Sequence, residues 1–413
     1  MNFYDESLKM HEENSGKMEI ISRVPINNKA DLSIAYTPGV AQPCLEIHSN
    51  PDAAYTYTPK GRMVAVVSDG SAVLGLGNIG GLASIPVMEG KAVLFKAFGG
   101  VDAVPICLKT QDIEEIINIV KNISPVFGGI NLEDISAPRC FEIERRLQEE
   151  LDIPVFHDDQ HGTAIVVSAA IINSFKLLRR PLRSVKVAVN GAGAAGTAIV
   201  KMLLSIGIHD IVICDSSGLI STNRLSELSM EKIELLELTN KSDIRGGLAE
   251  AVRGRDLFIG VSGPRLLTGD MVASMSEKPV IFAMSNPEPE IMPDIAQEAG
   301  AFIIGTGRSD FPNQINNVLV FPGIFKGALA ARASRITEKM KVAAAYALAG
   351  CISDGDLSES YIIPGAFEPG VADAVAGAVA KAWLDDHSEN AAAAAASASP
   401  EALGAGAAAD GPA

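Results

Sequence analysis

Short apolar runs alternate with amphipathic stretches along most of this chain. A short apolar run between two helical stretches is typical of a strand that is buried on both faces of a parallel sheet. The pattern therefore indicates an α/β fold. It predicts strands at residues 63–67, 93–95, 129–132, 153–156, 185–189, 211–214, 257–261, 280–283 and 302–304.

Helices are predicted between these runs. In residues 110–123, apolar side chains recur at the spacing of one helix face. The apolar stretch 162–178 is expected to end at Arg179-Arg180-Pro181, since proline cannot continue the hydrogen-bond ladder of a helix. Further helices are expected at residues 1–16, 138–151, 194–206, 323–350 and 369–385.

Two domains are expected, because 413 residues exceed one ordinary core. We predict an N-terminal α/β domain at residues 1–161 and a Rossmann-type doubly wound parallel sheet at 162–335. Residues 336–388 are expected to form helices that pack back on the first domain. Residues 389–413 are rich in Ala, Gly and Ser and are predicted to be a low-complexity tail.

The composition narrows the class of protein. The formal net charge of −16 makes nucleic acid and anionic membranes unfavourable partners. An anionic substrate would then need a locally cationic or metal-centred site. The five cysteines have no C-x-x-C spacing and are expected to be buried free thiols. With no signal peptide and no apolar run long enough to cross a bilayer, we expect a cytoplasmic protein.

A glycine fingerprint follows the strand at 185–189. In Gly191-Ala192-Gly193-Ala194-Ala195-Gly196, the three glycines would allow a tight turn, close approach of the backbone to a pyrophosphate, and helix–strand packing. Asp215 ends the next strand, where an acidic side chain can accept hydrogen bonds from ribose hydroxyls. No Lys or Arg adjoins Asp215, which favours NAD. NADP would remain possible if a distant Lys or Arg folded into reach.

A second fingerprint, Gly75-Leu76-Gly77-Asn78-Ile79-Gly80, lies in the first domain. No acidic residue ends a following strand at the distance that a dinucleotide site needs. We interpret it as a glycine-rich loop that shapes the substrate cleft.

Two adjacent carboxylate pairs end apolar runs of the first domain. They are Glu133-Asp134 and Asp158-Asp159, and oxygen ligands of this kind suit Mg²⁺ or Mn²⁺. Glu133, Asp134 and one of the second pair could supply three protein ligands. His157 and His161 flank the second pair, but no matching ligand spacing supports zinc. Both histidines are expected to line a cleft or form hydrogen bonds.

Two further residues carry possible acid–base chemistry. Tyr36 lies at the turn Tyr36-Thr37-Pro38-Gly39, and Lys91 follows a glycine-rich loop and enters an apolar run. Desolvation lowers the pKa of a partly buried lysine, which would make Lys91 usable as a general base. Taken alone, Tyr36 could equally be a packing residue and Lys91 a solvated charge.

Taken together, these motifs resemble the malic enzyme family in its short bacterial form. The likeness runs in order over residues 36–323. It rests on Tyr36-Thr-Pro-Gly-Val40, Ser68-Asp69-Gly70, Gly75-Leu-Gly77, Gly90-Lys91, Leu132-Glu133-Asp134, Phe156-His-Asp-Asp-Gln-His-Gly-Thr163, Asn190–Gly196, Ser285-Asn286-Pro287, Asn316-Asn317-Val318 and Phe321-Pro-Gly323.

The resemblance implies oxidative decarboxylation of L-malate to pyruvate and CO₂ with reduction of NAD(P)⁺. By position, Lys91 matches the general base and Tyr36 the general acid. Asp158 matches a carboxylate near the lysine. The metal set implied is Glu133, Asp134 and Asp159. The remaining implied contacts are Asn286 and Asn317 with substrate or cofactor, and Ser262 with the cofactor beside Gly191, Gly193, Ala194, Ala195, Gly196 and Asp215.

One departure from the larger members of the family concerns the second substrate carboxylate. Those members carry an arginine shortly after the Asp-Gly pair, but here Asp69-Gly70 is followed by Ser71-Ala72-Val73. Arg62 and Lys96 are the candidates for this contact.

Two other functions stay open. A malolactic-type enzyme would retain NAD and release lactate, and a non-catalytic subunit would only bind nucleotide. The resemblance also implies a homodimer or a dimer of dimers.

Overall fold

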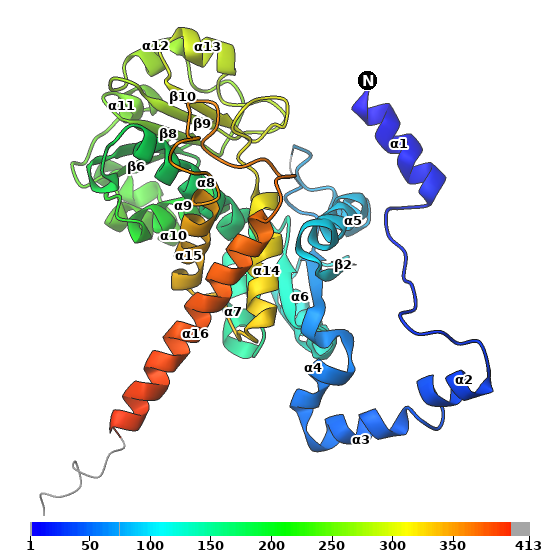
Figure 1. Cartoon of the computed structure of the whole chain (residues 1–413). Helices are drawn as coiled ribbons and strands as arrows, with labels where there is room; N and C mark the ends of the chain where they lie inside the picture. The colour runs from blue at the N-terminus through cyan, green and yellow to red at the C-terminus, as the bar shows by residue number, and fades with distance from the viewer. Residues whose placement is uncertain (1, 74, 398–413) are drawn as a thin grey trace, which may run out of the picture.

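The computed structural model describes residues 2–73 and 75–397 and contains two mainly parallel sheets (Figure 1). The first sheet has four parallel strands in the order β2 (Asp102–Cys107), β1 (Met63–Ser68), β3 (Gly129–Leu132) and β4 (Val155–His157). The second has six strands in the order β10 (Ile303–Thr306), β9 (Val280–Ala283), β8 (Leu257–Gly260), β5 (Lys186–Asn190), β6 (Asp210–Asp215) and β7 (Gly218–Leu219).

The second sheet is doubly wound, as the sequence predicts. Its strands pair in parallel apart from the β6–β7 pair, which is antiparallel. Strand order reverses at β5, which has β6 on one side and β8 on the other. Ligands of open α/β sheets bind at the carboxyl ends of the strands beside such a switch point.

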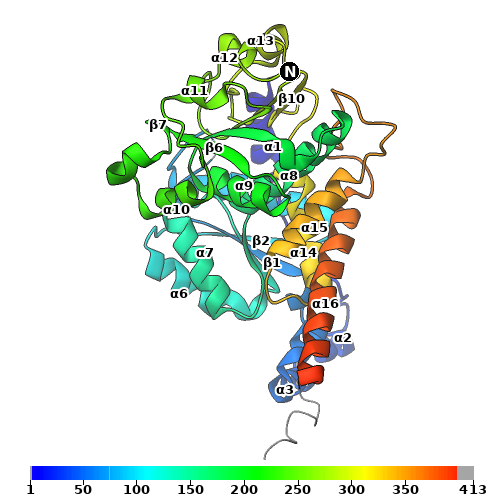
Figure 2. The same ribbon diagram turned by 90° about the vertical axis from the view of Figure 1, so that its left-hand side faces the viewer.

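Helices cover both faces of the two sheets (Figures 1 and 2). Those within and after the sheets are α5 (Gly80–Gly99), α6 (Ile113–Ile123), α7 (Arg139–Glu150), α8 (Asp158–Leu177), α9 (Ala194–Ser205), α10 (Met230–Leu238), α11 (Leu248–Val252), α12 (Gly269–Ala273), α13 (Pro293–Glu298), α14 (Phe321–Ala330), α15 (Glu338–Ala349) and α16 (Val371–Ser397). Short 3₁₀ helices occupy η1 (Pro51–Ala53), η2 (Pro59–Arg62), η3 (Ser124–Val126), η4 (Leu182–Ser184), η5 (Thr222–Glu227) and η6 (Asn317–Leu319).

Three apolar clusters hold the layers together. Alternate residues of β1 point to opposite faces, so Val64 and Val66 join one cluster while Ala65 and Val67 join another. The largest cluster is shared by both sheets, because the buried side chains of α8 pack between them. Helices α14 and α16 contact α5, and α15 contacts α8. No helix of the described residues is long and apolar enough to cross a membrane.

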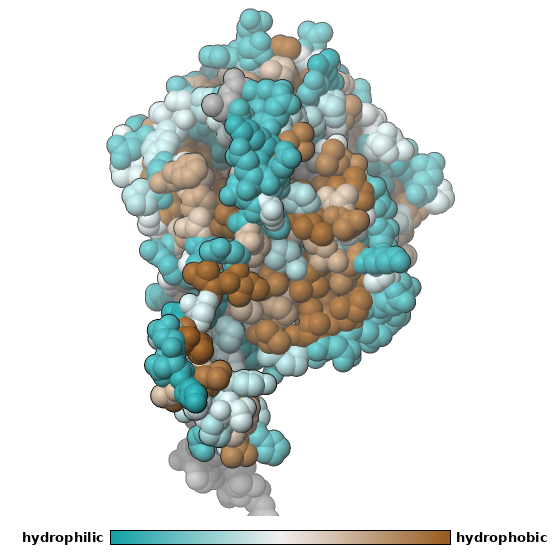
Figure 3. All heavy atoms as spheres, turned by 90° about the vertical axis from the view of Figure 1, so that its right-hand side faces the viewer, coloured by the Kyte–Doolittle hydropathy of each residue, from teal (hydrophilic) through white to brown (hydrophobic). Residues whose placement is uncertain are grey.

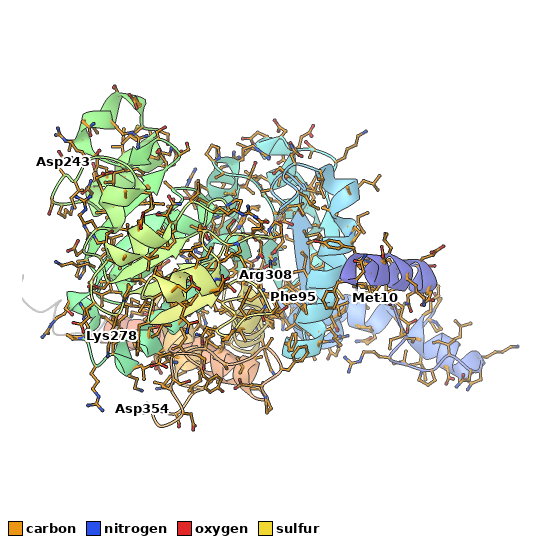
Figure 4. The ribbon with its side chains drawn as sticks, turned by 90° about the horizontal axis from the view of Figure 1, so that it is seen from above. Met10, Phe95, Asp243, Lys278, Arg308 and Asp354 are labelled. Atoms are coloured by element: carbon orange, nitrogen blue, oxygen red, sulfur yellow. The ribbon has the colours of Figure 1, made fainter. Side chains whose placement is uncertain are left out.

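The N-terminal residues 2–57, which we call the N-terminal arm, pack very little on the rest of the chain. The arm contains α1 (Phe3–Asn14), α2 (Lys29–Ala35), α3 (Ala41–Ser49) and α4 (Ala54–Tyr57), and none of these helices has a buried residue. Figure 1 shows α1 to α3 standing apart from the two sheets. Seen from above in Figure 4, Met10 of α1 lies at the outer side of the first sheet.

Some sequence predictions need correction. The strand predicted at residues 93–95 is wrong, because these residues lie in α5. This helix is apolar nearly all round, so periodicity could not separate it from a buried strand. Strand β2 was not predicted. Helix α16 continues to Ser397, beyond the predicted end at residue 385, and the tail from residue 398 lies outside the described residues.

The cysteines form no disulfide among the described residues. Cys140 and Cys214 are buried as predicted, Cys107 and Cys351 are half-buried, and Cys44 on the N-terminal arm is exposed.

Candidate functional site

The first sheet brings two acidic residues to one lysine. Leu132 and His157 are register partners on β3 and β4, so the residues that follow them, Glu133 and Asp158, lie side by side at the carboxyl edge. The Lys91 ammonium, carried by α5, lies between them. Its Nζ is 2.7 Å from Glu133 Oε1 and 2.5 Å from Asp158 Oδ2, and all three side chains are buried.

Further groups fix the geometry around this ion pair. Asn317 Nδ2 donates to Asp158 Oδ2 at 2.6 Å. The backbone N–H of Asp134 donates to Asp159 Oδ2 at 2.8 Å, which joins the two acidic pairs directly. The ring of Phe321 faces the lysine ammonium, with its centroid 4.1 Å from Nζ, a cation–π contact that also excludes water.

Four carboxylates and one lysine leave a surplus of negative charge in a buried place. Burial raises the pKa of Asp134 to about 9, and the neighbouring Asp159 and Glu133 add to the shift. Burial also raises the pKa of Asp158 to about 7 and that of Asp159 to about 6, although Lys91 opposes both shifts. A site of this kind favours a further positive charge.

The pKa of Lys91 moves opposite to the sequence prediction. Burial alone would lower the pKa of Lys91, but the charges of Asp158 and Glu133 outweigh it and raise the pKa above its ordinary value. The predicted lowering considered only desolvation. It omitted the carboxylates because they come from other elements.

The acidic residues have the chemistry of a Mg²⁺ or Mn²⁺ site, although they are not arranged around one point. No three Asp, Glu, His or Cys side chains of residues 2–73 and 75–397 form a ready-made ligand set. Glu133 and Asp158 instead contact the lysine ammonium, and Asp158 Oδ1 is buried with no hydrogen-bond partner. The surplus charge and this free oxygen fit a hard divalent cation beside Glu133, Asp134 and Asp159.

The structure does not bring Tyr36 to this cluster within one chain. Tyr36 follows α2 on the N-terminal arm, and its side chain is 67% exposed. The backbone hydrogen bonds of Tyr36 are made with Leu32 and Val40 of the arm itself.

The fingerprint glycines have three different environments. Gly191 adopts a positive φ of 122°, which a tight turn requires. A Cβ on Gly196 would lie 1.8 Å from the carbonyl oxygen of Gly191, so α9 packs closely here. A Cβ on Gly193 would meet no atom within 4 Å, which leaves this backbone open beside Ala194 and Ala195. These environments match the three roles that a pyrophosphate-binding turn needs.

Loops of the two sheets meet beside the fingerprint. Asn190 Nδ2 donates to Ser262 Oγ at 2.7 Å, which links the ends of β5 and β8. Asn286 follows β9, and a Cβ on Gly75 of the first sheet's glycine-rich loop would lie 3.5 Å from Pro287 Cδ. The carboxyl ends of both sheets therefore face a common region.

Asp215 has two basic partners that the local sequence does not reveal. Arg224 Nη1 lies 2.9 Å from Asp215 Oδ1, and Lys232 Nζ lies 2.7 Å from Oδ2. The N–H of Ser217 donates to Oδ1 at 2.9 Å. Hydrogen bonds from these groups hold the pKa of Asp215 down at about 2, against the opposing effect of burial.

Arg62 and Lys96 do not lie at the site. Both form ion pairs with Asp102 at the start of β2, the opposite end of the strands from the acidic cluster. The prediction that one of them binds a substrate carboxylate is therefore wrong.

Several buried polar groups were missed because their partners are distant in sequence. Arg139 Nη1 pairs with Asp69 at 2.8 Å, and its Nη2 donates to Ser71 Oγ at 2.9 Å, which ties the start of α7 to the loop after β1. His161 Nε2 lies 3.0 Å from Glu144 and its Nδ1 lies 3.1 Å from Lys341 Nζ. His161 thus forms hydrogen bonds, as predicted.

The side chain of His157 is buried next to the acidic cluster. Neither ring nitrogen has a hydrogen-bond partner among the described residues, and Nδ1 is 3.7 Å from Asp159 Oδ2.

Gly162 leaves the room that Asp158 occupies. A Cβ at position 162 would lie 1.8 Å from Asp158 Oδ1. We expect Gly162→Ala to displace this carboxylate and to lower kcat by about tenfold or more, since small misplacements of reacting groups are costly. Steady-state kinetics and a melting curve would measure this. Gly377→Ala in α16 is the matched control, because a Cβ there meets no atom within 4 Å. A Gly162→Ala enzyme with unchanged kcat would contradict the assignment.

Comparison with known proteins agrees with this architecture. Residues 15–148 match the malic enzyme N-terminal domain, and residues 160–383 match the malic enzyme NAD binding domain. The chain is 56% identical to a bifunctional malic/malolactic enzyme of Bacillus subtilis over 93% of its length and 94% of the relative's. It is 49% identical to an NADP-dependent malic enzyme of Salmonella typhimurium over 90% of its length and 51% of the relative's.

A solved structure gives the same result. The crystal structure of the NAD-dependent malic enzyme from Thermotoga maritima superposes with a TM-score of 0.88 at 50% identity, over 90% of this chain and 98% of that one. Sequence, fold and site together show that this chain belongs to the malic enzyme family, whose matched members depend on NAD or NADP.

Proposed function

We propose that the protein oxidises and decarboxylates L-malate to pyruvate and CO₂, reduces NAD(P)⁺, and depends on a divalent metal. The observation that carries the proposal is the buried Lys91 ammonium between Glu133 and Asp158, at the edge of the sheet that faces the glycine fingerprint. We also propose that residues 1–161 bind malate and metal and that residues 162–335 bind the cofactor.

Glu133, Asp134 and Asp159 are the proposed ligands of Mg²⁺ or Mn²⁺. A bound cation would supply Lewis-acid stabilisation of the oxygen anion that develops during decarboxylation. The carboxylates themselves provide the charge that such an ion needs. Burial raises the pKa of each of the three, and neighbouring carboxylates add to the shifts.

Lys91 is the proposed base. In this structure Glu133 and Asp158 keep Lys91 protonated. A cation held by Glu133 would offset part of that charge and lower the pKa of Lys91. The neutral amine would then take the proton of the malate C2 hydroxyl while hydride passes from C2 to the nicotinamide. Asp158 pairs with the Lys91 side chain, and Asn317 donates a hydrogen bond that holds the Asp158 carboxylate in place. The ring of Phe321 covers the lysine. The resulting β-keto acid loses CO₂, and the phenol of Tyr36 donates a proton to C3.

The function is tested by following reduced nicotinamide with L-malate and Mn²⁺, with EDTA as control. Metal-dependent formation of reduced nicotinamide and pyruvate in equal amounts is expected. Absence of any reduction with either cofactor would refute the proposal.

A malolactic reaction is the second candidate function, because the Bacillus subtilis relative is named as bifunctional for it. In this reaction NAD would stay bound and lactate would leave with no net redox change. Lactate in the reaction mixture, measured by an independent assay, distinguishes the two reactions. A purely nucleotide-binding role is disfavoured by the buried set of Lys91, Glu133, Asp134 and Asp159.

The surroundings of Asp215 favour use of NADP as well as NAD. The lone pairs of its carboxylate are engaged by Arg224, Lys232 and Ser217, so it is a poor acceptor for ribose hydroxyls. Two cations beside one carboxylate give the ribose end of the site a net positive charge, which suits a 2′-phosphate.

Lys232→Met is expected to raise the Kd for NADPH by about tenfold, as loss of one charge-assisted contact would, and to change the Kd for NADH little. Fluorescence titration measures both without turnover. Lys278→Met is the control, because this lysine contacts Phe302 at the other end of the sheet (Figure 4). Equal effects of Lys232→Met on both cofactors would contradict a role in phosphate recognition.

A further inference from the structure

L-Malate carries two carboxylates, and the acidic cluster with its cation accounts for only one of them. The chain has a net charge of −16, and the cluster itself has a surplus of negative charge that repels a further anion. A divalent cation would hold one carboxylate of malate beside the cluster. The second carboxylate therefore needs a cationic group of its own.

Helix α5, which carries Lys91, offers no second cation at this end of the strands. Its other lysine, Lys96, pairs with Asp102 at the opposite end. The exposed side chains of α5 include Leu82 and Val87, and Figure 3 shows a broad hydrophobic area on this side of the molecule. A cation for the second carboxylate must therefore come from another element.

Arg139 begins helix α7 close to the acidic cluster, but its guanidinium is already engaged. Nη1 pairs with Asp69 and donates to the carbonyl of Gln111, and Nη2 donates to the hydroxyls of Ser71 and Ser136. Asp69 is buried, and taking the cation away from a buried carboxylate is costly. Arg139 therefore holds loops together and is not available to a ligand.

Arg308 lies where loops of the two sheets meet. It follows β10 at the carboxyl edge of the second sheet, and its Nη1 donates to the carbonyl of Pro287 at 2.9 Å. The glycine-rich loop of the first sheet approaches the same Pro287 at Gly75. A Cβ on the neighbouring Gly307 would lie 3.0 Å from Nδ2 of Asn286, the amide implied to contact substrate or cofactor. Figure 4 shows Arg308 in the middle of the molecule, between the two sheets.

The segment that carries Arg308 continues to the acidic cluster. The N–H of Ile315 donates to the carbonyl of Thr306 at 2.7 Å, which closes the loop around Arg308. Asn317 follows this loop and donates to Asp158, the carboxylate that pairs with the proposed base. One short stretch of chain thus connects Arg308 with the group that takes the C2 proton.

The guanidinium of Arg308 already holds a carboxylate by two hydrogen bonds. Nε donates to Asp310 Oδ1 at 2.8 Å and Nη2 donates to Oδ2 at 2.6 Å, which is the geometry in which arginine binds carboxylate ligands. The carbonyl of Pro287 and the ring of Phe311, 5.3 Å from the guanidinium carbon, hold the group independently of Asp310. Asp310 is exposed, so this pair stabilises the fold little and a ligand carboxylate can replace it.

We infer that Arg308 binds the carboxylate of L-malate that the cation does not hold, and that Asp310 occupies its place in the free enzyme. This role of Arg308 rests on the proposed function for the identity of the ligand. The contact fixes malate at both ends, with Lys91 at the C2 hydroxyl and Arg308 at the far carboxylate. It also distinguishes malate from 2-hydroxy acids with a single carboxylate, such as lactate.

Isothermal titration in Mn²⁺ without oxidised cofactor measures binding in the absence of turnover. L-Malate and L-lactate share the 2-hydroxy carboxylate, and lactate lacks the second carboxylate. We expect Arg308→Gln to raise the Kd for L-malate by about tenfold or more, as loss of a charge-assisted two-point contact does, and to leave the Kd for L-lactate unchanged. Equal weakening of both ligands, or of neither, would overturn the inference.

Arg245→Gln is the matched control, because Arg245 also pairs with an aspartate two residues away, Asp243. Figure 4 shows Asp243 at the far side of the molecule from Arg308. This variant should leave the Kd for L-malate unchanged, and an effect as large as that of Arg308→Gln would contradict a specific contact.

Asp310→Asn tests the exchange of one carboxylate for the other. It is expected to lower the Kd for L-malate by about twofold or more, since malate no longer has to displace a surface ion pair. A Kd that does not fall would exclude Asp310 as the group that malate replaces.

Failure of the proposed function gives a different pattern. If the wild-type enzyme forms no reduced nicotinamide from malate but Arg308→Gln still weakens malate binding selectively, the carboxylate contact stands and the reaction is wrong. If the wild-type enzyme oxidises malate and Arg308→Gln leaves KM and Kd unchanged, the reaction stands and the contact is wrong. A wild-type protein that does not bind malate overturns both.

Discussion

Replacing Lys91 by methionine is expected to lower kcat for malate oxidation by at least about 10²-fold, because a positioned base contributes that much or more. The Lys91 Nζ lies 2.7 Å from Glu133 and 2.5 Å from Asp158, so the change removes the cation that pairs with both carboxylates. The Kd for NADH should change little, since the nucleotide fingerprint belongs to the other sheet. Steady-state kinetics and fluorescence titration measure the two quantities.

Loss of a buried cation also destabilises the fold, so the control must be matched for burial. Lys341 is exposed to the same extent as Lys91, 7%, and pairs with Glu338 and His161. Breaking the buried pairs of Lys91 can cost several kcal/mol of unfolding free energy, roughly 3–5. The cost at Lys341 should be smaller, because its partner Glu338 is exposed. We therefore expect both methionine variants to melt earlier but only Lys91→Met to lose turnover. Comparable kcat in both variants would remove Lys91 from the mechanism.

Replacing Asp134 by asparagine is expected to stabilise the metal-free protein and to abolish its response to Mn²⁺. The pKa of Asp134 rises on folding from 3.8 to about 9, so the folded state binds more protons than the unfolded state between these values. The free energy of unfolding then falls as pH rises from about 4 to about 9. An asparagine carries no charge, so the free energy of unfolding of the variant should not fall with pH for this reason.

Melting curves in EDTA and in Mn²⁺ across this pH range test both parts. With Mn²⁺ the wild-type protein should gain stability, since a ligand that binds only the folded state stabilises it. Asp134→Asn should gain much less. Asp243→Asn is the contrast, because hydrogen bonds from Thr222 hold the pKa of Asp243 down at about 2, and its removal should destabilise at neutral pH. A melting temperature of Asp134→Asn that still rises with Mn²⁺ as in the wild type would exclude Asp134 as a ligand.

The predictable part of the site came from groups at the ends of strands. Glu133 and Asp158 follow β3 and β4, and parallel neighbours bring their carboxyl ends together whatever the helices between them do. Gly191 and Asp215 were predicted for the same reason, since Gly191 directly follows β5 and Asp215 ends β6. Strand order in a parallel sheet is therefore enough to place these residues.

The rest depended on long-range packing. Lys91 was predicted as a possible base at the end of a glycine-rich loop, before a strand at residues 93–95, but it lies inside α5. This helix is apolar on its exposed side as well as its buried side, so its sequence shows no helical period. Arg224 and Lys232 reach Asp215 from η5 and α10, and the spacing of these residues in the sequence does not predict the contact. The position of Tyr36 depends on the arm, whose own contacts with the chain are few.

The position of helix α8 limits where the chain can be divided into two halves. It begins with Asp158 and Asp159 at the acidic cluster and then runs, as one element, through the apolar cluster common to both sheets. A cut or graft near residue 161 would fall inside its first turns. Exchange of the cofactor half with that of another dehydrogenase would therefore disturb the acidic residues as well. Recombinant hybrids should be joined before β4 or after Leu177, so that the whole helix comes from a single parent.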